Sequence, residues 1–373
     1  MIKTITKWVK KEILLVISWV LAIVSTCIVP LDKFYIEYID WKTLGLLFSL
    51  MAVMAGLKEM GVFQAFGESL LLKVKSKRAV ESVLVLLCFF SSMIITNDVA
   101  LITFVPFALE VLTMANLKKH IIPVVVMQTV AANLGSMLTP IGNPQNLYLY
   151  SKSGMSLEDF LITVLPYVIL SFFLLVIFFM YRKNEPVGHI LKNSENNNIK
   201  KNKVICYSML FLLCLLCVAK IVPVYIVVII TILFLFIMDR KILKKIDYSL
   251  LLTFVGFFIF VGNMGRISIL KQMIEQLLKG NEIITIIGAS QVISNVPAAL
   301  LLSGFTNKWD ILLIGTNLGG LGTMIASMAS LISYKYIIKE VPEEKGNYFI
   351  YFTVANIVFL FINLLLYWIL HIN

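Results

Sequence analysis

The chain has 373 residues, of which 60% are hydrophobic and 14% charged, and its mean hydropathy is +0.93. This excludes an ordinary soluble protein, whose apolar share is nearer ~45–50%, and it excludes a transmembrane β-barrel, because the apolar runs are long rather than short and alternating. The net charge of +11 comes from Lys and Arg in short runs between apolar segments. We therefore expect a lipid bilayer as a partner and no nucleic acid.

The apolar segments predict an all-α polytopic membrane protein. A crossing needs about 20 apolar residues, and the predicted full spans are 12–30, 41–57, 159–181, 203–219, 221–239, 247–264 and 347–370. Most basic runs fall on one side of the membrane when the N-terminus is placed in the cytoplasm, as the positive-inside rule expects. We predict a multi-pass protein of the cell membrane (plasma or inner), with a cytoplasmic N-terminus and an uncleaved first helix.

Polar residues interrupt four other membrane-length segments: 80–117, 120–150, 283–305 and 309–336. We interpret the first and third as re-entrant hairpins with Asn97 and Asn295 at their tips, each preceded by an interfacial amphipathic helix. The second and fourth are too long and too broken for simple helices, so we interpret them as broken transmembrane helices. Non-helical backbone at membrane depth must be buried in protein or line a cavity. The four segments therefore predict a shared central site.

The interrupted segments occur as two copies. An eighteen-residue stretch from Asn133 returns from Asn317, 184 residues later, with seven identical positions. The tip around Asn97 returns around Asn295, 198 residues later. The basic loops place the two hairpins on opposite sides of the membrane, so the predicted fold has two inverted-topology repeats. The predicted organisation is a first repeat over 1–181, a cytoplasmic linker over 182–202 and a second repeat over 203–373.

Each break exposes two kinds of binding group. The N–H groups of the following half-helix attract anions, and the carbonyls of the preceding half-helix attract cations. Thr139, Asn143 and Asn146 in the first copy correspond to Thr323 and Ser327 with Ser330 in the second, and hydroxyls and amides bind ligands of either sign. The alternative is that small and hydroxyl residues line close helix contacts, but the two Asn residues are too polar for packing alone.

Asp98 is the one acid that we place deep in the membrane. An intramembrane ionisable group is a functional hypothesis by default, and Asp98 has no counterpart, because Val296 stands in its place in the second repeat. We expect it to exchange a proton or to bind Na⁺ near Asn97, Asp98 and Asn295. The alternative is that the Asp98 carboxylate only caps the hairpin helix.

At these residues the chain resembles the ion transporter superfamily of citrate permeases, arsenite permeases and sodium/proton antiporters, and it is most similar to the anion permease branch. The resemblance rests on the two tips and on two further motifs, Thr-Pro-Ile-Gly-Asn-Pro-Gln-Asn at 139–146 and Gly-Gly-Leu-Gly-Thr at 319–323. It implies two opposed hairpins, a site between their tips and the broken helices, and a homodimer with an elevator-like motion. Dicarboxylate carriers of the superfamily have Ser-Asn-Thr at both tips. The tips here, Thr-Asn-Asp and Ser-Asn-Val, are closer to the arsenite permease and antiporter members.

The predicted function is secondary active transport of a small anion, an inorganic oxyanion or a carboxylate, coupled to H⁺ or Na⁺ by alternating access. A Na⁺/H⁺ antiporter is the alternative. No HExxH or GxSxG motif is present, so we expect no enzyme, and no cofactor apart from Na⁺ as a coupling ion. The predicted binding residues are Thr96, Asn97, Asp98, Asn133, Thr139, Gly142, Asn143, Asn146, Ser294, Asn295, Pro297, Asn317, Gly320, Gly322, Thr323 and Ser327.

Overall fold

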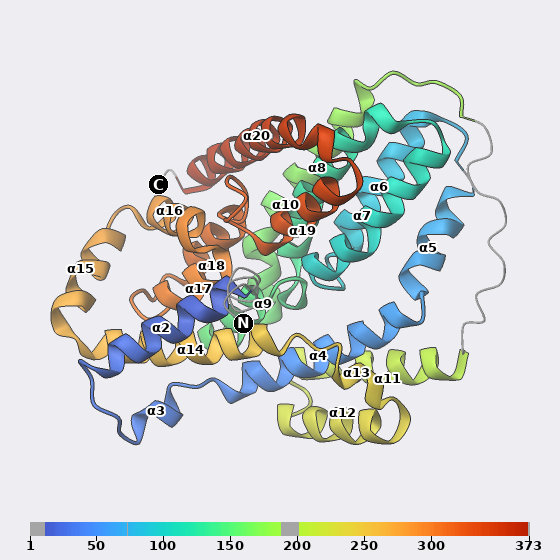
Figure 1. Ribbon diagram of the computed structural model, residues 1–373. Coiled ribbons are helices and arrows are strands. Elements are labelled where there is room, and N and C mark those ends of the chain that lie inside the picture. The colour runs from blue at the N-terminus through green and yellow to red at the C-terminus, as the bar shows by residue number, and fades with distance from the viewer. Residues whose placement is uncertain (1–11, 73, 188–200, 372–373) are drawn as a thin grey trace, which may run out of the picture.

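The computed structural model describes residues 12–72, 74–187 and 201–371, and this part of the chain forms helices and no strands (Figure 1). In chain order, its first half contains α2 (Ile13–Thr26), α3 (Phe34–Glu37), α4 (Trp41–Glu59), α5 (Val62–Leu71), α6 (Lys77–Ser91), α7 (Asn97–Met114), the 3₁₀ turn η1 (Lys118–His120), α8 (Ile121–Gly135), the 3₁₀ turns η2 (Ser136–Leu138) and η3 (Pro140–Gly142), α9 (Pro144–Ser153) and α10 (Leu157–Met180). The predicted linker 182–202 is described only at its ends, because 188–200 lie outside the described residues.

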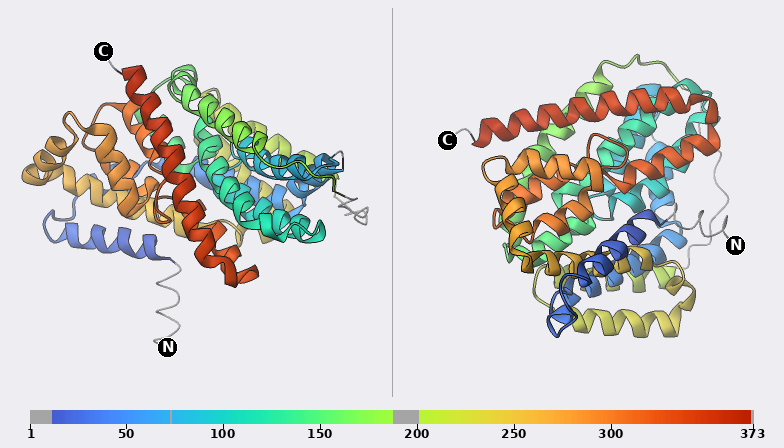
Figure 2. Two further views of the ribbon diagram at one scale, coloured as in Figure 1. Left: turned by 90° about the horizontal axis from the view of Figure 1, so that it is seen from above. Right: turned by 60° about the vertical axis from the view of Figure 1, so that its left-hand side comes forward.

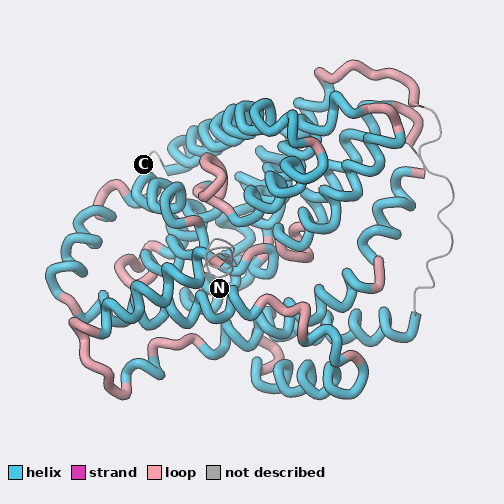
Figure 3. The backbone as a smooth tube through the Cα atoms, viewed as in Figure 1, coloured by secondary structure: helices cyan, strands magenta, loops and turns pink. Residues whose placement is uncertain are grey.

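The second half has a similar order of helices after one additional helix, α11. It contains α11 (Lys201–Val218), α12 (Val224–Met238), α13 (Arg240–Leu243), α14 (Tyr248–Arg266), α15 (Ser268–Leu278), α16 (Glu282–Ile293), α17 (Asn295–Leu302), α18 (Trp309–Leu318), α19 (Met328–Glu340), η4 (Pro342–Glu344) and α20 (Lys345–His371). Both interrupted crossings are broken at the predicted positions: the 3₁₀ turns η2 and η3, with Thr139 and Asn143 extended, separate α8 from α9, and non-helical backbone separates α18 from α19. Figure 3 shows such non-helical stretches inside the molecule.

Seven of the described helical segments are long and apolar enough to cross a membrane, which agrees with a polytopic membrane protein. Two of the predicted full spans are shorter than expected, because α2 has 14 residues and α12 has 15. Pro223 fixes the start of α12, since proline lacks the N–H that a preceding turn would need. By contrast α7, an arm of the first predicted hairpin, has 18 residues and meets the length and hydropathy of a span.

The helices form two groups, which we call the frame and the bundle. The frame consists of α2, α4 and α11–α14, in which α2 packs against α14 and α4 packs against α11 and α12. The bundle consists of α6–α10 and α16–α20, and α8 lies at its centre in contact with α6, α7, α10, α19 and α20. In Figure 1 the frame runs along the bottom and the bundle lies above it, and the right-hand view of Figure 2 keeps this order. Each group therefore takes helices from both halves of the chain.

Burial separates central helices from peripheral ones. The apolar stretch of the span Lys118–Leu138, which contains α8, is 89% buried in the protein. The apolar stretch of the span that contains α20 is only 22% buried. A helix that is apolar on every side suits a membrane whether its neighbours are protein or lipid. The exposed apolar residues of α20 and α12 therefore mark surfaces for lipid or for another protein.

The frame and the bundle are in contact at several places, and short helices link them. α14 packs against α17, and α4 packs against α9. The amphipathic helix α5 connects α4 to the bundle, and α15 connects α14 to the bundle. α5 and α15 lie at opposite ends of the molecule (Figure 1).

Equivalent caps begin the two long frame helices. α4 and α14 each have 19 residues, and each follows an aspartate whose carboxylate accepts a backbone N–H three residues later. Asp40 accepts from Thr43 at 3.0 Å and Asp247 accepts from Leu250 at 3.0 Å. These caps satisfy one of the free N–H groups of the first helical turn. They fix where each frame helix starts.

We expect Gly135→Ala to destabilise the bundle. A β-carbon at Gly135 of α8 would collide with the backbone carbonyl of Phe89 on α6, where the two helices approach closely. Forced overpacking costs typically ~1–3 kcal/mol, which thermal unfolding of the detergent-solubilised protein measures. Gly288→Ala is the matched control, because nothing lies within 4 Å of its β-carbon position on α16. Equal unfolding midpoints for both variants would contradict the close α6–α8 contact.

Candidate functional site

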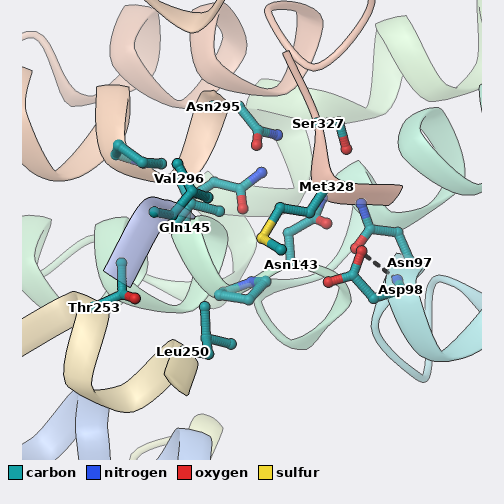
Figure 4. A pocket seen from close by; sticks show the side chains of 13 residues that line it. Asn97, Asp98, Asn143, Gln145, Leu250, Thr253, Asn295, Val296, Ser327 and Met328 are labelled. Atoms are coloured by element: carbon teal, nitrogen blue, oxygen red, sulfur yellow. Dashed lines mark hydrogen bonds between the residues drawn. The ribbon is translucent and has the colours of Figure 1, made fainter. Parts of the chain in front are cut away.

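Four helices begin at one place inside the molecule. α7 starts at Asn97, α9 at Pro144, α17 at Asn295 and α19 at Met328, and the first residues of all four line one pocket (Figure 4). We call it the central pocket, and its bundle wall consists of Asn97, Asp98, Asn143, Pro144, Gln145, Asn295, Val296, Pro297, Ser327 and Met328. Helix N-termini present unpaired N–H groups and a partial positive charge. Four such ends face the same small volume.

The frame supplies the rest of the wall. Leu14 of α2 and Leu250 and Thr253 of α14 face the pocket. The pocket volume is about 20 Å³, and a site of this size holds about one water molecule. A larger solute therefore requires the frame and the bundle to separate at this point.

Local sequence explains why α7 starts at its pocket residues. Thr96 is extended, and its hydroxyl oxygen accepts the N–H of Val99 at 3.4 Å. The side-chain oxygen of Asn97 accepts the N–H of Asp98 at 2.8 Å. Both are caps of the kind that Thr and Asn provide. The Asp98 carboxylate is thus not needed for capping, and within the described part of the chain it accepts no hydrogen bond.

The other three helices start after residues that leave the helical conformation. Asn143 and Ser327 are extended, and proline occupies the first position of α9 after Asn143. Ser294 has a φ of +73°, which is unusual for a residue with a β-carbon. The N–H of Asn295 donates to the carbonyl of Ala326 at 2.9 Å, which ties α17 to the break before α19.

Two asparagines make hydrogen bonds to three of the four helix starts, those of α7, α9 and α19. The side-chain oxygen of Asn133 accepts from the Asn97 amide at 3.0 Å and from the Ser327 hydroxyl at 3.0 Å. The side-chain oxygen of Asn317 accepts from the Asn143 amide at 3.3 Å, and its own amide donates to Asn146 at 2.7 Å. Since buried polar groups are expensive unless they are paired, this network specifies one arrangement of the helix ends.

The hydrogen bonds of the two copies are reciprocal. Asn133 and Asn317 are equivalent residues of the eighteen-residue repeat, and so are Asn143 and Ser327. Asn133 of the first copy bonds to Ser327 of the second, and Asn317 of the second copy bonds to Asn143 of the first. Each copy therefore completes the site of the other.

Thr139 and Thr323, the threonines of the two breaks, make equivalent hydrogen bonds in the two copies. The Thr139 hydroxyl donates to the carbonyl of Met93 at 2.5 Å, and the Thr323 hydroxyl donates to the carbonyl of Gln291 at 3.1 Å. Met93 and Gln291 are 198 residues apart, the same offset that relates Asn97 to Asn295. Both threonines tie a broken helix to its neighbouring helix pair rather than face the pocket.

The structure thus divides the predicted binding residues into two sets. Those that line the central pocket are Asn97, Asp98, Asn143, Asn295, Pro297 and Ser327. Those that lie behind it or hold it in place are Thr96, Asn133, Thr139, Gly142, Asn146, Ser294, Asn317, Gly320, Gly322 and Thr323. A β-carbon at Gly142 would meet the backbone of Ser136, and Gly322 has a φ of +112°. These glycines serve close packing and backbone geometry.

The pocket contains one acid and no base. Among the described residues of its wall, Asp98 has the only carboxylate, and none is Lys, Arg or His. Within the same part of the chain, no group of three or more His, Cys, Asp and Glu side chains is arranged to hold a metal ion. The helix N-termini attract an anion, while Asp98 and the amide oxygens attract a proton or a cation. The pocket therefore suits an anion together with a positive ion.

Sequence reasoning missed several wall residues. Gln145 lies within the quoted motif at 139–146, and its position next to two Asn residues at a helix start is a signal that was available. Leu14, Leu250 and Thr253 belong to helices without a motif, so only the fold reveals them.

A buried acid also went unnoticed. Glu81 on α6 is fully buried, it forms an ion pair with Arg182 at 3.1 Å, and its carboxylate lies 2.9 Å from the His120 ring. Asp98 has no such partner in the described part of the chain. Glu81 therefore has the environment of a structural ion pair, and Asp98 does not.

The all-helical fold and its apolar spans are those of a multi-pass membrane protein, and the family and relatives described next are transporters, not enzymes. A family model described as citrate transporter matches residues 2–306. The chain belongs to this citrate transporter family, within the ion transporter superfamily.

Curated relatives agree with this assignment. An uncharacterised transporter of Methanocaldococcus jannaschii is 33% identical over 322 residues, which cover 85% of this chain and 86% of that protein. The inner membrane protein YbiR of Escherichia coli is 28% identical over 80% of each chain. The silicon efflux transporter LSI3 of Oryza sativa is 35% identical over 128 residues, which are 34% of this chain and 26% of that protein.

We expect Asn133→Leu to destabilise the protein and to abolish transport. The substitution removes the acceptor of Asn97 and Ser327, and a buried donor left without a partner costs ~1–3 kcal/mol. Asn356→Leu on α20 is the matched control, because that side chain is also fully buried but its amide donates only to its own helix, at Phe352. Thermal unfolding and flux assays measure both effects. Retained transport in Asn133→Leu would show that the network is dispensable.

Proposed function

We propose that the protein is a secondary active transporter of a small anion, an inorganic oxyanion or a carboxylate, coupled to H⁺ or Na⁺. The observation that supports this best is the meeting of four helix N-termini around one unpaired carboxylate. Each helix N-terminus acts as roughly half a positive charge, so the ends together replace the missing Lys or Arg. The family description names citrate, a carboxylate, and one relative is named for silicon efflux.

The small size of the pocket couples the binding of the anion to the binding of H⁺ or Na⁺. An anion bound there lies within a few ångströms of the Asp98 carboxylate, and two like charges repel strongly where water is excluded. A proton on Asp98 removes this repulsion. A Na⁺ ion held by Asp98 with the amide oxygens of Asn97 and Asn295 removes it equally well, and all three side chains line the pocket. The anion and the positive ion therefore bind together.

We propose that the fold consists of two inverted repeats, over 1–181 and 203–373, joined by a cytoplasmic linker over 182–202. The reciprocal hydrogen bonds and the placement of α5 and α15 at opposite ends support this. The helix pairs α6–α7 and α16–α17 are then re-entrant hairpins that enter from opposite sides. The N-terminus lies in the cytoplasm, and the protein resides in the plasma or inner membrane.

Alternating access is a movement between the frame and the bundle. Ten of the thirteen lining residues belong to the bundle, so a bound solute moves with it. At one end of the molecule the Tyr150 hydroxyl donates to the carbonyl of Val218 at 3.0 Å, and Lys220 donates to the carbonyl of Gly154 at 3.2 Å. These bonds between bundle and frame must break when the two groups separate. The exposed apolar residues of α12 provide the contact for a homodimer.

A Na⁺/H⁺ antiporter is the second candidate. The presence of one carboxylate among amide oxygens, with no basic side chain among the described wall residues, favours cation binding. In that case Na⁺ is itself the substrate, and it competes with a proton for Asp98.

We expect Asp98→Asn to abolish ion-coupled flux without unfolding the protein. The amide is close in size and cannot exchange a proton or neutralise Na⁺. The measurement is the internal pH of proteoliposomes containing a pH-sensitive dye, after addition of Na⁺ alone and then of phosphate, sulfate, succinate and citrate. Proton movement that requires an anion identifies the anion transporter, and proton movement with Na⁺ alone identifies the antiporter.

Glu110→Gln is the matched control for this prediction. Glu110 lies on the same helix α7, but it is exposed and far from the central pocket. The control should keep wild-type flux. Wild-type coupling in Asp98→Asn would remove Asp98 from the mechanism.

A further inference from the structure

Gln145 is the buried amide of the central pocket whose two polar side-chain atoms both lack a hydrogen-bond partner among the described residues. It is the second residue of α9, its exposed fraction is 1%, and neither its amide nitrogen nor its carbonyl oxygen has a hydrogen-bond partner within the described residues. Its side chain lines the pocket, and Figure 4 shows it well apart from Asp98. A buried amide without partners destabilises a fold. A leucine would fill this space without that penalty.

Most other amides of the site are engaged. The Asn133, Asn146 and Asn317 amides all bond within the network, and they hold the helix ends together. The Asn143 amide donates to the Ser136 hydroxyl at 2.7 Å, which leaves its side-chain oxygen unpaired. The fully buried side-chain atoms of the pocket amides that lack a partner are thus two oxygens, of Asn143 and Gln145, and the Gln145 nitrogen. The Asn295 amide nitrogen, also at the pocket, donates no hydrogen bond within the described residues and is a further free donor.

Gln145 and Asp98 are both polar residues whose equivalents in the second copy of the repeat are apolar. The repeat places Ala329 at the position of Gln145 and Val296 at the position of Asp98. Each of the two residues therefore lacks a polar counterpart. A pocket with different groups at two ends binds an unsymmetrical solute in one orientation.

We propose that Gln145 is a specificity-determining residue that binds a hydroxyl group and a neighbouring oxygen of the solute, at the end remote from Asp98. The solute class is an oxygen acid that keeps at least one O–H when bound. The proposal rests on the proposed transport function and refines its substrate class.

The hydroxyl requirement comes from the balance of donors and acceptors. The helix N-termini supply N–H donors for the charged oxygens of the solute. The side-chain oxygens of Asn143 and Gln145 can only accept hydrogen bonds, so they need a donor on the solute. Sulfate and succinate offer none, whereas hydrogen phosphate and malate do. A site that hydrogen-bonds a substrate hydroxyl rejects an analogue lacking it, because its own polar groups are then left unpaired.

The test uses three pairs of solutes that differ by a hydroxyl group: phosphate and sulfate, malate and succinate, citrate and tricarballylate. The full chain is reconstituted in proteoliposomes, and uptake of each labelled solute is measured for the wild type, Gln145→Leu and Gln145→Ala. The wild type should prefer the hydroxyl-bearing member of any transported pair. Both variants should lower that preference by about tenfold, which corresponds to ~1.4 kcal/mol, the size expected when a buried polar group loses its partner.

A second readout does not depend on transport. Ligands that bind only the folded protein raise its unfolding temperature, so the increase caused by each solute reports binding in detergent. Gln145→Leu should unfold at or above the wild-type temperature without ligand and should lose the extra increase given by the hydroxyl-bearing solute. Gln64→Leu, on the exposed face of α5, is the control and should keep the wild-type preference.

The outcomes separate this inference from the proposed function. Transport with an unchanged preference in the Gln145 variants, or a wild-type preference for sulfate, succinate or tricarballylate, would overturn the role of Gln145 and leave anion transport standing. Proton movement driven by Na⁺ alone, with no binding or uptake of any of the six solutes, would overturn the anion transport function and this inference together.

Discussion

The structure depends on one constraint: backbone N–H and C=O groups that leave a helix inside the membrane must find partners within the protein. Four helices begin near the middle of this molecule, and none of these beginnings can face lipid. They therefore face one another. Asn133 and Asn317 bond to the starts of α7, α9 and α19, partly across the two copies of the repeat, and the N–H of Asn295 ties α17 to Ala326. The central pocket is the space that remains where these ends meet. The ion binding that we propose for it and its place in the fold have the same physical origin.

Much of this arrangement could be predicted from residues alone. The breaks at 135–144 and 319–327 were visible because Gly, Pro, Asn and Ser interrupt apolar segments, and in the structure an α-helix ends and another begins at both. Asp98 was visible because charge is rare at membrane depth. By contrast, the sequence does not show which of the polar residues line the pocket and which hold the broken helices in place. Thr139 and Asn143 are four residues apart in one motif, yet the first ties the broken helix to Met93 and the second lines the pocket.

Contacts between segments that are far apart in the sequence could not be predicted. No pattern in α2 or α14 distinguishes Leu14 or Leu250 from the other apolar residues of those helices, so only three-dimensional packing places them at the pocket. The pairing of Glu81 with Arg182 is similar, because the two residues are far apart in the sequence. Short-range signals predict where a helix breaks, and long-range packing decides which side chains then meet.

The frame wall of the pocket has a consequence for the kinetics of transport. The frame contributes two leucines and Thr253, whose hydroxyl already donates to the carbonyl of Ser249 within its own helix at 2.7 Å. In the movement that we propose, a solute held by the bundle therefore exchanges few hydrogen bonds with the frame surface that it passes. In that mechanism tight binding does not by itself slow the movement, because the polar residues that would bind the solute and the mainly apolar residues that it would pass lie on different groups of helices.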